Sequence, residues 1–75
     1  MKILKAVPAA GYCITIYFDN HHSVTLDMKS KLETVRFSSL RDEQVFCAAR
    51  TDGKAVYWPR GISMAVSEII ELIAK

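Results

Sequence analysis

Apolar and polar residues alternate along much of the chain, which is the pattern of half-buried β-strands. Residues 12–18 are rich in β-branched and aromatic types, and Ile14, Ile16 and Phe18 fall on one face. A second alternating run follows at residues 23–28. The polar segment 19–22 between the two runs is short, so we predict that they form a hairpin.

The rest of the chain carries weaker patterns. Ile3, Lys5 and Val7 are expected to share one face of a first strand, which ends near Pro8 and Gly11. Residues 29–37 show no clear period, and residues 38–44 have the start signal of a short helix. Asp52-Gly53 is a strong hairpin turn, which predicts strands over residues 46–51 and 55–58. Pro59 has no N–H for a ladder, so it is expected either to end the second of these strands or to place that strand at an edge of the sheet.

From Ala65 onward the apolar period becomes helical. We predict one helix over residues 65–74 that packs through Val66, Ile69, Ile70 and Ile73. The residues expected to meet this helix are Ile14, Ile16, Phe18, Leu26 and Trp58. The predicted fold is therefore α+β, an antiparallel sheet of about five strands with a C-terminal helix packed on one face.

Composition narrows the class of protein. The chain has 75 residues, so residues 1–75 are expected to form a single domain, and 51% of them are hydrophobic, which is enough for a core. The net charge of +2 is too small to predict nucleic-acid binding by itself. No apolar run reaches membrane-spanning length and the first residues lack a signal-peptide core, so we expect a cytoplasmic protein without a membrane partner.

Few residues suggest catalysis. Cys13 and Cys47 have no partner at a metal or nucleophile spacing, and we interpret them as small apolar residues in a reducing compartment. His21 and His22 are adjacent in a turn, which is a weak spacing for a metal. Asp27, Asp42 and Asp52 fall at predicted turns or caps, where aspartate has structural roles. We therefore predict a protein without enzymatic activity, metal or cofactor.

Several segments together resemble a known family. They are Ile16-Tyr17-Phe18-Asp19-Asn20, Asp27, Phe37 with Leu40-Arg41-Asp42 and Phe46, and Trp58-Pro59-x-Gly61 ahead of a helix. In this order the chain resembles the small bacterial family called domain of unknown function 2442, over nearly its whole length. The resemblance implies an α+β fold without an assigned activity. Because some members lie beside DNA-binding or toxin–antitoxin-like partners, it also implies an accessory or antitoxin-like role.

Three positions depart from that family's pattern. His21 stands where the family usually has Gly, Ser63 where an acidic residue is usual, and Val66 where a Pro usually opens the last helix. Ser63 can still accept a backbone hydrogen bond, so the fold is expected to tolerate the change. A function that depends on the missing carboxylate is not expected here.

Two function classes remain open. The sheet face expected to lie away from the helix carries Leu4, Ala6, Cys13, Thr15, Tyr17 and Tyr57, and such a lightly polar face suggests contact with a partner. The function we favour is thus a non-catalytic interaction module, in a homo-oligomer or with a partner protein such as the toxin half of a bacterial pair. The alternative is a domain that binds a small anionic ligand or nucleic acid through Arg60 and the aromatic residues Trp58 and Tyr57. The candidate binding residues are Trp58, Arg60, Tyr17 and Tyr57.

Overall fold

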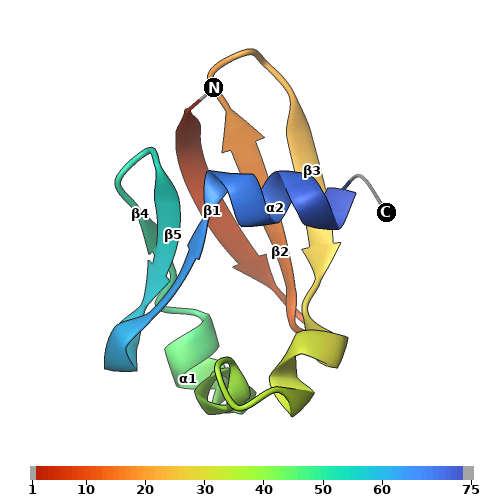
Figure 1. Ribbon diagram of the computed structural model, residues 1–75, viewed down its shortest axis with the longest axis vertical. Helices are drawn as coiled ribbons and strands as arrows, with labels where there is room; N and C mark the ends of the chain where they lie inside the picture. Colours follow the sequence, from red (N-terminus) through yellow and green to blue (C-terminus); the bar gives the residue numbers. More distant parts are fainter. Residues whose placement is uncertain (1, 74–75) are drawn as a thin grey trace.

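The computed structural model describes residues 2–73 and shows an α+β fold with two antiparallel sheets of three strands and a C-terminal helix (Figure 1). The first sheet has the order β1-β2-β3 and the second the order β4-β5-β6. The strand bounds are β1 Ile3–Ala9, β2 Cys13–Phe18, β3 Ser23–Asp27, β4 Arg50–Thr51, β5 Ala55–Trp58 and β6 Ile62–Ala65. The expectation of one sheet of about five strands is therefore wrong, although the fold class is confirmed.

Alternation in β2 and β3 sets the interior of the first sheet. Ile14, Ile16 and Phe18 are buried, and Leu26 of β3 is buried opposite Ile14. The hairpin between these strands is confirmed, with His21 at a left-handed φ of 67° in its turn. Met28, directly after β3, completes this apolar layer. Side chains from Cys13, Thr15 and Tyr17 point to the opposite face.

The predicted face of β1 is wrong, because a bulge changes its alternation. Ile3 pairs with Phe18, but the register shifts before Lys5, which pairs with Tyr17. The extra residue turns Lys5 and Val7 to the outer face and brings Ala6 opposite the buried Ile16. A bulge inserts one residue into one strand only, so every later side chain changes sides.

Short helical segments connect the two sheets. Turns of 3₁₀ helix cover Lys29–Glu33 (η1) and Ser38–Arg41 (η2), and α1 covers Glu43–Phe46. Asp42 caps α1, because its carboxylate accepts a hydrogen bond from the Gln44 N–H at 3.0 Å. The expected strand over residues 46–51 is reduced to β4, since the Asp42 cap favours a helical turn through Phe46.

The second sheet contains a strand that the sequence pattern did not predict. Residues 59–61 form a tight turn (η3) with Arg60 at a φ of 70°, and the chain then returns as β6 beside β5. In β6, Ile62 and Met64 are buried. Pro59 does end β5 as expected, but the turn that it opens leads into a strand instead of the helix.

The C-terminal helix α2 spans Val66–Ile73 and crosses the inner face of the first sheet (Figure 1). Its anchor is Ile69, which is fully buried, with Val66 and Leu72 partly buried beside it. Ile70 and Ile73 are 42% and 45% exposed, so the predicted face is wrong at these two positions. A helix of eight residues contacts a narrow sheet mainly through the centre of its apolar stripe. The residues at the borders of that stripe therefore remain partly exposed.

The buried residues of both sheets, the connecting turns and α2 belong to one hydrophobic cluster. A backbone hydrogen bond from Ile3 N–H to the Gly53 carbonyl, 2.9 Å long, joins β1 to the turn between β4 and β5. Within residues 2–73, no helix is long and apolar enough to cross a membrane.

Candidate functional site

The outer face of the first sheet gathers exposed apolar side chains. Leu4, Val7 and Tyr17 are 64%, 42% and 37% exposed and come from adjacent strands β1 and β2. No described element covers this face, because α2 lies on the opposite side of the sheet (Figure 1). We call the surface formed by Leu4, Lys5, Val7, Thr15 and Tyr17 the outer patch.

Two contacts between side chains fix the positions of residues in the outer patch. The Lys5 ammonium lies 4.7 Å from the centre of the Tyr17 ring, which orients both side chains. Thr15 and Thr25 share a hydrogen bond of 3.0 Å between their hydroxyl groups. The β3 side of this face is polar, with Ser23, Thr25 and Asp27. The patch is therefore apolar over β1 and β2, with one positive charge and a polar border.

Tyr57 and Trp58 are adjacent in β5 and face opposite ways. Trp58 is 4% exposed, stacks on Phe46, meets Phe37 edge to face and donates from Nε1 to the Phe46 carbonyl at 3.2 Å. Trp58 is thus a core residue, and its ring is not available as the exposed binding residue that one of the two function classes required. Tyr57 is partly exposed on the second sheet, so it does not join the outer patch.

The Tyr57 hydroxyl donates a hydrogen bond of 2.9 Å to Asp52. Asp52 also accepts from the N–H groups of Lys54 and Ala55, which closes the β4–β5 turn. The bonds from Lys54 and then from Tyr57 lower the pKa of the Asp52 carboxyl below its ordinary value. The same bond raises the pKa of the Tyr57 hydroxyl. This pair stabilises the turn that receives Ile3.

The four arginines do not form a single basic cluster. Arg60 lies at the left-handed position of its turn, 3.8 Å from Asp42. Arg41 donates to the Leu32 carbonyl and Arg36 binds Glu68. Arg50 lies opposite Tyr57 and lines a shallow hollow of about 270 Å³ with Trp58 and Pro59. Most of these guanidinium groups thus have partners within the protein.

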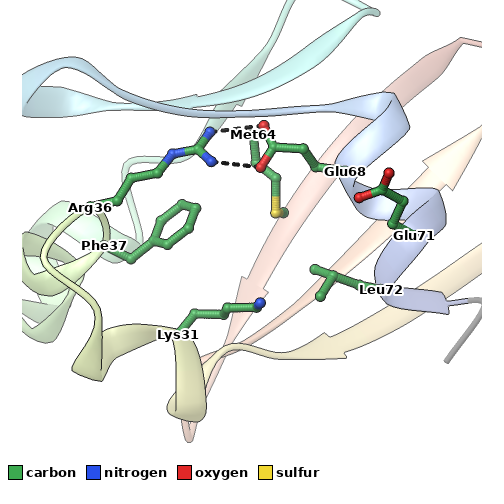
Figure 2. A pocket seen from close by; sticks show the side chains of 7 residues that line it. All are labelled: Lys31, Arg36, Phe37, Met64, Glu68, Glu71 and Leu72. Atoms are coloured by element: carbon green, nitrogen blue, oxygen red, sulfur yellow. Dashed lines mark hydrogen bonds and ion pairs between the residues drawn. The ribbon is translucent and has the colours of Figure 1, made fainter.

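A second small pocket, of about 160 Å³, lies between α2 and the segment that follows η1 (Figure 2). Arg36 and Glu68 close one side through two hydrogen bonds of 2.7 and 2.8 Å. The bond to Arg36 lowers the pKa of Glu68, and the bond to Glu68 raises the pKa of Arg36. The two charges compensate each other, so this ion pair attaches α2 to the connecting segment.

Arg36 and Glu68 are 32 positions apart, and nothing in their spacing along the sequence relates them. Their pairing depends on how the connecting segment passes α2, which only the three-dimensional structure shows.

The other residues considered for metal binding or catalysis are the histidines, cysteines and aspartates. In the part of the chain that the structure describes, no group of three or more His, Cys, Asp or Glu side chains could hold a metal ion. Cys13 and Cys47 are free thiols there. Comparisons with protein-family models, with curated proteins and with solved structures found no match to this chain.

Proposed function

We propose that this protein is a non-catalytic interaction module that binds a protein partner through the outer patch. The observation that carries the proposal is the exposure of Leu4, Val7 and Tyr17 together on one uncovered sheet face. Scattered single apolar side chains are normal on a surface, but a contiguous group on a rigid sheet is typical of an interface. The accessory or antitoxin-like role implied by the family resemblance is one form of such a module.

Charge defines the kind of partner. Lys5 stands among the apolar side chains and contacts the Tyr17 ring, and the whole chain carries a net charge of +2. A partner surface with apolar residues around an acidic one would match both features. Burial of Tyr17 in such an interface is favourable because its ring is already held in place by Lys5 and loses little freedom on binding.

A matched pair of substitutions tests the proposal. Val7→Glu places a charge in the outer patch, whereas Val35→Glu makes the same change at a residue that is 94% exposed outside it. We expect tagged wild type and Val35→Glu to retain the same partner from an extract of the source organism, and Val7→Glu to lose it. Circular dichroism should show native folding for both variants. Equal retention by Val7→Glu, or no retained protein with wild type, would refute the proposal.

The second candidate function is binding of a small anionic ligand or a nucleic acid beside Arg50. The hollow lined by Arg50, Tyr57 and Pro59 is the observation that favours it. Trp58 contributes only an edge there, since its ring is buried, and Arg60 already lies near Asp42. Titration with a short oligonucleotide at two salt concentrations checks this candidate, because affinity from phosphate contacts falls steeply with salt. Loss of that binding in Arg50→Gln, but not in Arg36→Gln, is the expected pattern.

A further inference from the structure

Strand β3 is a free edge of the first sheet. Within residues 2–73, the order β1-β2-β3 leaves one side of β3 without a neighbouring strand. Met28 N–H bonds to the Tyr12 carbonyl at 2.9 Å, and Phe18 N–H bonds to the His22 carbonyl at 2.8 Å. Since hydrogen-bonded positions alternate in an antiparallel ladder, even-numbered residues of β3 bond to β2. The N–H and C=O groups of Ser23, Thr25 and Asp27 therefore point away from the sheet.

This edge lacks the features that usually prevent pairing. Proteins block exposed edges with proline, lysine, bulges or a covering loop. Residues Ser23–Asp27 contain no proline and no lysine, and their register with β2 is regular from Cys13–Asp27 to Tyr17–Ser23. A strand with a regular register and unpaired N–H and C=O groups at alternate residues can form hydrogen bonds with another strand.

A hollow of about 510 Å³ lies beside the same edge, between β3 and the end of α2. Its lining is apolar at Val24, Leu26, Leu72 and Ile73 and polar elsewhere, with the charged residues Asp27 and Lys31. Ile73 is 45% exposed although it belongs to the apolar stripe of its helix. A strand added to β3 would place its inward side chains in this hollow and cover Ile73.

We propose that β3 pairs antiparallel with β3 of a second copy of this chain, around a two-fold axis at Thr25. In this register Thr25 pairs with its own copy, and Ser23 lies opposite Asp27 of the second copy. Val24 then lies opposite Leu26 of the second copy, on the face that enters the hollow. The register opposes no two like charges, and it uses every outward N–H and C=O of the strand.

Self-complementarity is what selects a second copy as the occupant. A two-fold interface uses the same surface on both partners, so the half-buried Val24 of each copy lies beside the hollow of the other, whereas Leu26 stays in its own core. A register shifted toward the end of the strand would bring Asp27 against its own copy and repel. Pairing through the edge of β3 does not use the outer patch, which stays uncovered on one face of the combined sheet.

Sedimentation equilibrium over a concentration series tests the proposal with Thr25→Pro and Thr25→Val. Both variants lose the hydroxyl bond to Thr15, but only proline removes the outward N–H at the two-fold axis. We expect wild type and Thr25→Val to reach twice the monomer mass, and Thr25→Pro to remain monomeric. Thr25→Lys, which keeps the backbone donor but opposes two charges, should weaken dimerisation by about tenfold or more.

The outcomes separate this proposal from the proposed function. Val7→Glu should dimerise as wild type does, because Val7 lies on β1 and away from the edge. Wild type that keeps the monomer mass at high concentration overturns the proposal, as does dimerisation of folded Thr25→Pro to the same extent as Thr25→Val. A β3 edge occupied by a strand from another protein, with wild type itself monomeric, also overturns it.

Discussion

The two edges of the first sheet are built in opposite ways. On β1, a bulge interrupts the register near Leu4, and Ile3 bonds to Gly53 of the second sheet. After the bulge, the backbone N–H and C=O groups of the odd-numbered residues of β1 point toward β2. The nitrogen of Pro8, an even-numbered residue, therefore points away from the sheet. On β3, the register is regular and the outward groups remain available. The same small sheet is thus closed on one side and open on the other.

The difference shows that an open edge is not a consequence of small size. Seventy-five residues suffice to block β1 with a bulge, a proline and the neighbouring turn. An edge with a regular register beside a partly apolar hollow is therefore informative about association. A small domain also gains stability when it buries further surface in a dimer.

The largest expected effect concerns α2, the helix that crosses the inner face of the first sheet. Ile69→Asp places a carboxylate at the fully buried anchor of α2 and should cost about 4 kcal/mol or more, which is enough to unfold a domain of this size. Ile70→Asp changes a side chain that is already 42% exposed and should lower stability by only about 1 kcal/mol. Urea denaturation measures both. Similar losses in the two variants would mean that α2 packs through a different face.

Proline substitutions compare adjacent positions of β3 directly. Val24→Pro removes an N–H that bonds to β2 and leaves a carbonyl of Ile16 without its donor, at a cost of about 2–3 kcal/mol. Thr25→Pro removes an N–H that points away from the sheet, as Pro8 does on β1, and should cost much less stability than Val24→Pro. Thermal denaturation at low protein concentration, where the monomer dominates, gives the comparison. A larger loss in Thr25→Pro than in Val24→Pro would reverse the assignment of inward and outward groups.

A glycine substitution loosens the closed edge. Gly53→Ala forces a side chain into a φ of 95° and should cost about 1–2 kcal/mol. Gly61→Ala imposes similar strain at a φ of 75°, in a turn that does not touch β1. Amide exchange at Ile3 should accelerate in Gly53→Ala and remain as in wild type in Gly61→Ala. Unchanged exchange at Ile3 in both would show that Gly53 does not hold this edge.

The smallest expected effect is a pH-dependent one, at Glu68 in the first turn of α2. The bond to Arg36 holds the Glu68 pKa below its ordinary value of 4.5, so its stabilising contribution is complete above that value. The contribution disappears as the pH falls through the lower pKa of the folded protein. Because the Glu68 side chain is 38% exposed, we expect Glu68→Gln to lose only about 0.5–1 kcal/mol at neutral pH. The gap between the two proteins should close in acid, and a gap that widens in acid argues against the ion pair.

Alternation along the sequence predicted the central strands well. β2 and β3 are regular, so a period of two correctly assigned the buried side chains Ile14, Ile16 and Phe18. The same rule was wrong on β1, because a bulge leaves no mark in composition and reverses the faces of Lys5 and Ala6. Strand β6 was missed because Ile62–Ala65 is short and merges into the apolar period of α2.

The candidate site was predicted only in part. Tyr17 lies in the outer patch as expected, but Val7 joins it through the bulge, and Tyr57 belongs to the other sheet. Trp58 could be assigned to the core from its neighbours, whereas the Arg36–Glu68 pair depends on a long-range path of the chain. The open edge has no sequence signal beyond the absence of proline and lysine in β3. Its exposure follows from the order of strands, which alternation does not determine.

Amide hydrogen exchange across β3 tests the central claim most directly. At low protein concentration the amides of Val24 and Leu26 should be protected by β2, and those of Ser23, Thr25 and Asp27 should exchange quickly. At high concentration the account predicts that the latter group becomes protected as well, in wild type and not in Thr25→Pro. Exchange at these three amides that stays fast at every concentration would contradict pairing of β3 with a second copy.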